Sequence, residues 1–228
     1  MKSIIFDLDN TLYPEETYVE SGFREVSNYL SSKYNLDKSI VFSKLMKIFN
    51  SKGRGKIFDI LLKELDLYSE KNVLLLVYIY RYHFPKIELY KDSLDVLNEL
   101  KANGFKLGLI TDGRSFVQKR KVEALGLNEY FDSIIFTDVL GSLFWKPSTV
   151  PYEITLDLLD SSAEESVYVG DDPYKDFLGA KKLGIKTIQI KREKEMDYWK
   201  DKGFNKTEAT FTITKLDELF KILNKIIV

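Results

Sequence analysis

The stretch "IIFDLDNTLY", from Ile4 to Tyr13, determines which fold the rest of the chain can adopt. Its apolar beginning is typical of a strand buried on both faces, and two carboxylates, Asp7 and Asp9, follow directly. Side chains alternate along a strand with a period of two, so this pattern places both carboxylates on the same face. Like charges this close repel each other, and a buried carboxylate without a partner costs several kcal/mol. We therefore expect a group beside this pair that neutralises its negative charge. The identity of that group would indicate the function.

The composition excludes several classes of partner and site. The chain of 228 residues has 34 basic and 35 acidic side chains, which gives no case for nucleic acid or an anionic membrane as partner. It has no cysteine, so disulfides, thiol catalysis and zinc–thiolate sites are excluded. The single histidine, His83, excludes multi-histidine metal sites. Any bound metal must therefore be held by oxygen ligands.

No apolar segment of the sequence indicates a membrane protein. The longest apolar run, "VLLLVYIY" from Val73, is far shorter than the ~20 residues that cross a bilayer. The chain reaches Asp7 without the apolar stretch of a signal peptide. We therefore expect a cytoplasmic protein with no membrane contact, either a monomer or a homodimer.

A helical insert follows the first strand. The next convincing strand is "FKLGLIT", residues 105–111, and a strand–helix–strand unit takes only about 30 residues. Apolar residues recur between them with helical spacing, and the run "VLLLVYIYRYHF" is apolar all round, which predicts a buried helix. We assign residues 14–90 to this insert and residues 92–103 to a first core helix. The residues with helical spacing are Val19, Phe23, Val26 and Leu30, then Val41, Leu45 and Ile48, then Ile57, Leu61 and Leu65.

Strands and helices alternate over the remainder of the chain. One helix is expected from Ser115, which forms a capping box with Gln118, and another from Pro173. Such alternation predicts an α/β fold, a doubly wound parallel sheet formed by residues 1–13 and 91–228. Ligands bind such sheets beyond the carboxyl ends of the strands. The polar residues expected at that edge are Asp7, Asp9, Thr111, Asp112, Asp171, Asp172 and Asp176.

Four separated motifs add a family resemblance. They are "DLDNTLY", "LITDG", "WKPS" with Lys146, and "VGDDPYKDFLGA". Together they resemble the four motifs of the haloacid dehalogenase-like superfamily of hydrolases, most of which are phosphatases. The resemblance covers nearly all of the chain, and the helical insert is similar to the cap domain of that superfamily. It implies a Rossmann-like core with an inserted α-helical cap.

The two carboxylates of the first motif suit phosphoryl transfer. A free aspartate has a pKa of about 3.9, so Asp7 would be ionised at neutral pH and able to attack phosphorus. This attack gives an aspartyl-phosphate that splits one difficult displacement into two easier ones. Asp9 resembles the family's general acid and base, a role that requires its pKa to rise toward neutrality. Crowding by other carboxylates would favour that rise.

A divalent cation would answer the charge problem of the opening motif. Two unit charges 4 Å apart, at an effective dielectric of 20, interact by about 4 kcal/mol, and Asp171 adds a further acid. Oxygen ligands suit Mg²⁺, and the resemblance implies that Asp7, Asp171 and the backbone carbonyl of Asp9 hold it. It also implies that Lys146 bridges nucleophile and phosphate, although "LGSLFWKPS" is bulkier than the family's usual turn. Asp172 is either a metal ligand or a helix cap.

Other candidates would bind substrate or support the site. Thr111 would donate its hydroxyl to a phosphoryl oxygen, with the amides of Asp112 and Gly113 beside it. Asp112 could equally be a turn former. Asp176 would align Lys146 or a metal-bound water, or else be a solvated helix residue. In "SKGRGK", Arg54 is flanked by glycines and could contact substrate, unless this basic loop is simply solvated.

The sequence therefore predicts an Mg²⁺-dependent phosphatase that hydrolyses a small phosphorylated metabolite through an aspartyl-phosphate. Family dehalogenases carry no acid two residues after the nucleophile, so Asp9 argues against that reaction. A phosphomutase is an alternative, distinguished by slow hydrolysis of its phosphoenzyme. A phospho-aspartate signalling receiver would be about half as long, would lack the helical insert and would carry its acceptor in the middle strand. A family member that binds partners without turnover is the remaining alternative.

Overall fold

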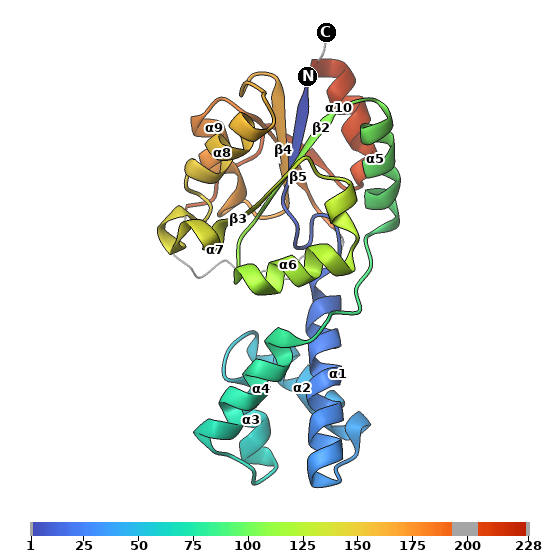
Figure 1. The fold of residues 1–228 in the computed structure, drawn as a ribbon, viewed down its shortest axis with the longest axis vertical. Coiled ribbons are helices and arrows are strands. Elements are labelled where there is room, and N and C mark those ends of the chain that lie inside the picture. The colour runs from blue at the N-terminus through green and yellow to red at the C-terminus, as the bar shows by residue number, and fades with distance from the viewer. Residues whose placement is uncertain (1, 193–204, 227–228) are drawn as a thin grey trace. The chain divides into compact units, whose positions relative to one another are not determined.

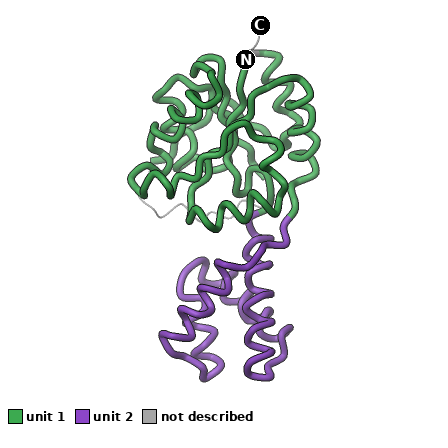
Figure 2. Tube along the Cα trace, in the orientation of Figure 1, with its two compact units in different colours: residues 1–14, 88–228 green, residues 15–87 purple. Residues whose placement is uncertain are grey.

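The structure is a computed structural model that describes residues 2–192 and 205–226. It divides into two compact units, which Figure 2 shows in different colours. We call residues 1–14 and 88–228 the core unit and residues 15–87 the helical unit.

A parallel sheet forms the centre of the core unit (Figure 1). Among the described residues it has six strands in the order β3-β2-β1-β4-β5-β6, and each neighbouring pair is parallel. Short, nearly continuous apolar runs form the central strands because helices cover both faces. The predicted α/β doubly wound sheet is therefore confirmed. The strands are β1 (Ser3–Phe6), β2 (Lys106–Thr111), β3 (Ser133–Phe136), β4 (Ser166–Gly170), β5 (Lys186–Ile190) and β6 (Phe211–Ile213).

Helices pack on both sides of this sheet. Helices α5 (Lys91–Ala102) and α10 (Leu219–Ile226) lie on one side, and α8 (Val150–Leu158) and α9 (Asp176–Lys182) lie on the other (Figure 1). The remaining elements of this unit are α6 (Ser115–Ala124), α7 (Thr137–Leu140) and the 3-10 turns η1 (Leu127–Glu129), η2 (Ser142–Phe144) and η3 (Leu216–Glu218). Beneath α8 and α9 lies a buried cluster that includes Ile5, Ile110, Tyr152, Tyr168 and Phe177.

The strand order places a switch point beside β1. The chain runs from β1 to β2 and β3 on one side, then returns to form β4 on the other side of β1. Adjacent crossovers leave in opposite directions at such a point, so a crevice opens at the carboxyl ends of the strands. The amide of Asp7 donates to the carbonyl of Val169 at 2.9 Å, which holds the end of β1 against β4.

Four helices form the helical unit: α1 (Glu15–Tyr34), α2 (Lys38–Lys52), α3 (Ile57–Glu64) and α4 (Glu70–Tyr82). Most of the apolar residues with helical spacing are buried here, as Val19, Phe23, Val26 and Leu30 on α1 show, whereas Ile57 and Leu65 are only partly buried. Asp37 caps α2, because its carboxylate accepts from the amides of Ser39 at 2.7 Å and Ile40 at 3.1 Å.

Helix α4 differs from its prediction. The run from Val73 is helical, but Leu76 is the one residue of α4 that is buried, and Leu74, Tyr78 and Tyr82 are 69%, 57% and 42% exposed. The prediction of a buried helix was wrong because α4 packs against α1 and α3 on one face only. Within residues 2–192 and 205–226, none of the helices has both the length and the apolar character needed to cross a membrane.

The cap of one predicted helix and the start of another also differ from the structure. Helix α6 begins at Ser115, but no side chain caps it, and the amide of Ser115 donates to the Asp138 carboxylate at 2.9 Å instead. The predicted capping box with Gln118 is therefore wrong, because the Gln118 amide is used elsewhere. Helix α9 begins at Asp176 rather than at Pro173, since the intervening residues form a turn.

Candidate active site

Three carboxylates meet at the switch point of the sheet. Asp7 follows β1, Asp171 follows β4, and Asp176 opens α9. Each offers one oxygen atom, and these three atoms all lie within 4.8 Å of one another. Asp7 and Asp176 are 1% and 0% exposed, so water provides little screening. Groups of positive charge must therefore balance this cluster.

Lys146 provides one of those charges. Its Nζ donates to Asp7 Oδ1, to Asp176 Oδ1 at 2.7 Å and to the Tyr168 hydroxyl at 3.1 Å, and its side chain is fully buried. Burial alone would lower the pKa of Lys146, but Asp176 and Asp7 raise that pKa well above its usual value. Lys146 is thus held as an ammonium group between the two carboxylates. The structure brings the predicted pair of Asp7 and Lys146 into direct contact.

Asp176 holds the cluster in place. Its Oδ1 accepts from Lys146 and, at 3.0 Å, from Tyr168, and its Oδ2 accepts from the amide of Asp172 at 2.9 Å. Burial would raise its pKa, but Lys146 and Lys175 lower it. Asp176 is therefore a carboxylate whose donors fix Lys146 on one side and the Asp172 turn on the other.

A glycine permits this close packing of Asp176. A side chain at Gly170, the last residue of β4, would place its Cβ 2.5 Å from Asp176 Oδ2. That distance is shorter than any ordinary contact, so a larger residue would displace the carboxylate. The position before the acidic motif is therefore a glycine because the Asp176 carboxylate occupies the space that a side chain would need.

The remaining acids suit a cation. Asp171 Oδ1 and Asp172 Oδ2 are buried and have no hydrogen-bond partner within the part of the chain that the structure describes. Burial, and then repulsion by Asp7, raises the pKa of Asp171 well above its usual range. Burial also raises the pKa of Asp7 to about 7, although Lys146 opposes this, so the prediction of a fully ionised Asp7 at neutral pH was wrong for this structure. Buried carboxylate oxygens without donors are the ligands that a hard divalent cation needs, so the residues present fit such an ion.

Asp172 has a second role besides any contact with a cation. Its Oδ1 accepts from the amide of Tyr174 at 2.9 Å, which stabilises the turn ahead of α9. Lys175 in the same turn was not singled out in the sequence. Burial would lower the pKa of Lys175, but Asp7, Asp176 and Asp171 raise it, so its ammonium also balances the acidic cluster.

Asp9 belongs to a separate set of contacts. Strand β1 ends at Phe6, so the period-two argument does not extend to Asp9. Lys121 Nζ lies 2.6 Å from Asp9 Oδ1, which also accepts from the Tyr13 hydroxyl, and Gln118 Nε2 donates to Asp9 Oδ2 at 2.9 Å. Asp9 thus has its own cation, Lys121 on helix α6, whose side chain is 3% exposed.

The charge state of Asp9 differs from its prediction. Burial would raise its pKa, but Lys121, together with the hydrogen bonds from Tyr13 and Gln118, lowers it to about 2. The predicted rise toward neutrality was wrong for this structure, because donors rather than other carboxylates surround the group. The protonated form of Asp9 therefore requires a change in these contacts.

The second motif, "LITDG", contacts the surroundings of Asp9 through Thr111 and the segment of Lys146 through Asp112. The hydroxyl of Thr111, at the end of β2, accepts from Gln118 Nε2 at 2.5 Å. Asp112 accepts from the Thr137 hydroxyl at 2.7 Å and from the amide of Lys146 at 3.2 Å. Its carboxylate therefore fixes the segment that carries Lys146, a role different from the turn former or substrate contact considered for it. Gly113 follows with a φ of 120°, a conformation that glycine adopts readily.

The predicted substrate contact Arg54 lies in the helical unit. Its Nη2 is 2.6 Å from Glu15 Oε2 at the start of α1, and its side chain is 45% exposed. Gly53 and Gly55 on either side have φ values of 68° and 122°. The loop is thus tied to α1 by an ion pair, and a role for Arg54 in substrate binding stays a prediction.

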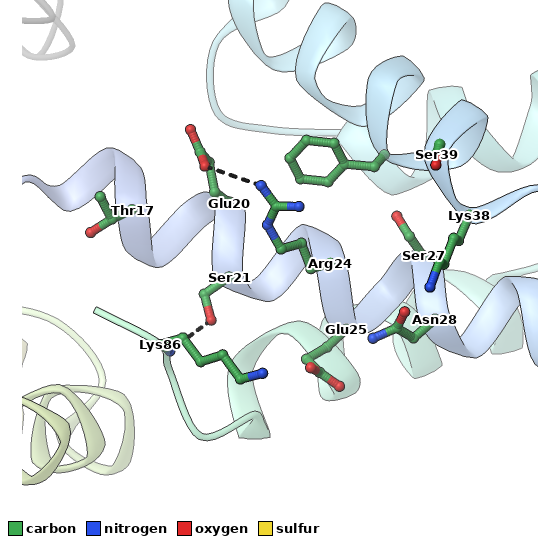
Figure 3. A pocket seen from close by; sticks show the side chains of 11 residues that line it. Thr17, Glu20, Ser21, Arg24, Glu25, Ser27, Asn28, Lys38, Ser39 and Lys86 are labelled. Atoms are coloured by element: carbon green, nitrogen blue, oxygen red, sulfur yellow. Dashed lines mark hydrogen bonds and ion pairs between the residues drawn. The ribbon is translucent and has the colours of Figure 1, made fainter. Parts of the chain in front are cut away.

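The helical unit also contains a pocket of about 530 Å³, separate from the "SKGRGK" loop (Figure 3). Side chains of α1 and the start of α2 line it, with Lys86. Arg24 lies 4.4 Å from the centre of the Phe42 ring and 3.7 Å from the Glu20 carboxylate. Both acids and bases line this pocket, so its charge favours no one class of ligand.

Besides Lys175, sequence reasoning missed four residues of the site. Gln118 was assigned to a capping box, and Tyr13, Lys121 and Tyr168 had no role. One signal was present for two of them: Gln118 and Lys121 are three residues apart, which puts them on one face of the helix that follows Thr111.

Comparisons with known proteins agree with this geometry. The model of the haloacid dehalogenase-like hydrolase family matches residues 4–190. A curated relative from Methanocaldococcus jannaschii, named glyceraldehyde 3-phosphate phosphatase, is 36% identical over 99% of this chain and 98% of its own length. The crystal structure of an HAD phosphatase from Thermococcus onnurineus is 28% identical, with a TM-score of 0.62 over 98% of each chain. The HAD-hydrolase YfnB from Bacillus subtilis, bound to magnesium, is 22% identical and shares the fold with a TM-score of 0.65 over 98% of each chain.

Proposed function

This chain belongs to the haloacid dehalogenase-like hydrolases, and we propose that it hydrolyses a small phosphomonoester through a phosphoenzyme formed on Asp7. One observation supports this most: a buried carboxylate, Asp7, lies against a buried ammonium, Lys146, and beside Asp171, whose Oδ1 has no donor among the described residues. That arrangement supplies a nucleophile together with the positive charge that a phosphate group requires.

In the first step, Asp7 attacks phosphorus and the bond to the leaving oxygen breaks. Lys146 keeps the carboxylate oriented and offers its charge to the incoming phosphoryl oxygens. The Thr111 hydroxyl donates to one of these oxygens. Protonated Asp9 gives its proton to the leaving oxygen, which departs as an alcohol.

In the second step, water attacks the phosphorus of the aspartyl-phosphate. Asp9, now a carboxylate, accepts a proton from this water, and inorganic phosphate and free Asp7 result. The contacts of Asp9 in this structure favour its carboxylate, which is the form that the second step requires. The proton that Asp9 gains here is the one that it gives to the next leaving group, so protons balance over the cycle.

The family and the acidic cluster point to a divalent cation, and we propose that this cation is Mg²⁺. Asp7 and Asp171 would hold it, with Asp172 as a further oxygen donor. When bound, the cation neutralises the charge that a dianionic substrate adds to the cluster. The magnesium in the related YfnB structure supports this choice.

For the substrate, we propose glyceraldehyde 3-phosphate. The name of the relative that is 36% identical over 99% of this chain supports this choice. A three-carbon phosphate is also among the small phosphorylated metabolites that the sequence predicts.

We further expect a monomer or a homodimer, which light scattering after size-exclusion chromatography would establish.

Phosphate release tests the proposal. The wild-type chain with Mg²⁺ should release phosphate from glyceraldehyde 3-phosphate faster than from a panel of sugar phosphates and nucleoside monophosphates. Asp7→Asn keeps the shape and removes the attacking charge, so it should abolish turnover, whereas Asp157→Asn on an exposed turn of α8 should not. Retention of more than a few per cent of the activity by Asp7→Asn would exclude Asp7 as the nucleophile. A phosphoenzyme that forms but hydrolyses slowly would favour a mutase.

A further inference from the structure

One face of helix α6 is directed at two predicted reactive groups. Gln118 and Lys121, which are 2% and 3% exposed, both contact Asp9. The Gln118 amide also contacts the hydroxyl of Thr111. A single buried side chain thus connects the phosphate-binding motif to the residue proposed as acid and base.

The chemistry of these partners fixes the direction of each hydrogen bond. Asp9 is surrounded by an ammonium, a phenol and an amide, and its oxygens accept from all three. Gln118 must therefore present its nitrogen, which has two hydrogens and no acceptor, to Asp9 and Thr111 alike. The Thr111 oxygen accepts one of these hydrogens. Its own single proton is then directed to another acceptor.

Packing holds the Gln118 amide in this position. A Cβ atom at Gly113 would lie 3.3 Å from Gln118 Cδ, so the glycine of the second motif leaves room for the amide. Lys121 Nζ lies 2.6 Å from Asp9 and 5.8 Å from the centre of the Tyr13 ring, so it holds one acceptor of the amide in place. The amide nitrogen itself lies 2.9 Å from Asp9 Oδ2 and 2.5 Å from the Thr111 hydroxyl.

We propose that Gln118 is a positioning residue that sets the proton of the Thr111 hydroxyl toward the phosphoryl group while it fixes one oxygen of Asp9. This inference rests on the proposed phosphatase function and extends it to a residue outside the four motifs. Gln118 touches neither the reacting phosphorus nor the leaving group. It acts through Thr111 and Asp9, so its loss should lower the rate without unfolding the chain.

Two substitutions distinguish a positioning role of Gln118 from a packing role. Gln118→Met keeps the length of the side chain and removes both donors, so kcat should fall ~10-fold, the value of about one hydrogen bond. Gln118→Glu keeps the shape but places an acceptor against Asp9 and Thr111, so its loss should be larger, ~100-fold. Lys119→Met on the exposed side of the same helix is the matched control and should keep the wild-type rate.

A double-mutant cycle with Thr111 provides a readout that general destabilisation would not change. If Gln118 acts through the Thr111 hydroxyl, Gln118→Met should cost much less in a Thr111→Val background than in the wild type. The residual loss, which passes through Asp9, should be smaller for aryl phosphates than for alkyl phosphates. Equal, additive losses with both substrates would overturn the inference and make Gln118 a packing residue.

Beryllium fluoride with Mg²⁺ tests the same inference without turnover. Fluorine resonances should report an adduct on Asp7 in the wild type, and Gln118→Met should need ~10-fold more beryllium fluoride for half occupancy, because one donor is misdirected. Lys119→Met should bind as the wild type does. An adduct without phosphate release would overturn the proposed function alone. Equal affinity in wild type and Gln118→Met would overturn the positioning role, and the absence of any wild-type adduct would overturn both.

Discussion

Tyr168→Phe tests the hydrogen bonds that hold Lys146 and Asp176 in place beside the nucleophile. The substitution removes the hydroxyl oxygen and leaves the ring. The Tyr168 hydroxyl accepts from Lys146 at 3.1 Å and donates to Asp176 at 3.0 Å, and the residue is fully buried. Tyr152 offers a matched comparison. It is equally buried, its ring lies 5.0 Å from that of Tyr168, and its hydroxyl donates to the backbone carbonyl of Asp176 at 2.7 Å.

The two substitutions should differ in cost because their partners differ in charge. Hydrogen bonds to charged groups contribute about 1.5–3 kcal/mol each, and those between neutral groups about 0.5–1.5 kcal/mol. Tyr168→Phe loses two bonds to charged groups, but Lys146 and Asp176 still contact each other, which limits the loss. We therefore expect a destabilisation of about 2–3 kcal/mol for Tyr168→Phe and about 1 kcal/mol for Tyr152→Phe.

Urea unfolding in EDTA, followed by tryptophan fluorescence, measures these costs without a bound cation to offset them. Trp145 precedes Lys146 in the core unit and reports its unfolding. Phosphate release provides the second measurement: Tyr168→Phe should lower kcat because Lys146 loses an acceptor, and Tyr152→Phe should not. A Tyr152→Phe variant as destabilised as Tyr168→Phe would refute the assignment of charge-assisted bonds to Tyr168.

Further substitutions test the other parts of the site. Asp9→Asn should lower the rate by about 10²–10⁴-fold for alkyl phosphates and less for aryl phosphates, whose leaving groups need little protonation; equal losses would assign Asp9 to structure. EDTA should stop turnover and Mg²⁺ should restore it, with Asp171→Asn raising the Mg²⁺ concentration for half activity; a rate unchanged by chelation would contradict the cation site. Arg54→Ala should weaken kcat/KM for the natural substrate by about 1.5–3 kcal/mol and spare a small aryl phosphate. Glu15→Gln is the control, because it breaks the ion pair with Arg54 and leaves Arg54 itself in place. Equal effects of Arg54→Ala on both substrates would show that this loop is solvated and does not contact substrate.

The sheet could be predicted from the sequence because its strands are short apolar runs that end in polar residues. The positions of Asp7 and Lys146 followed from the family motifs rather than from periodicity. Contacts between distant segments could not be derived in this way: Lys121 reaches Asp9 across 112 residues, and nothing near either residue encodes the pairing. The charge of Asp9 was mispredicted for the same reason, since two of the three donors that lower its pKa, Gln118 and Lys121, come from a distant segment. The burial of helix α4 was mispredicted, although the helix itself was not, because a sequence shows how apolar a helix is but not how many neighbours it has.

The central place of β1 has a consequence for the order in which the protein can fold during synthesis. The first strand made becomes an inner strand, and its two neighbours, β2 and β4, begin at residues 106 and 166. Asp7 meets its ammonium partner only when a lysine 139 residues later has left the ribosome. The helical unit, by contrast, is one continuous segment with local contacts, which form quickly. The chain therefore completes the helical unit while its nucleophile still lacks a site, and chemistry becomes possible only after Asp171 and Asp176 have been made.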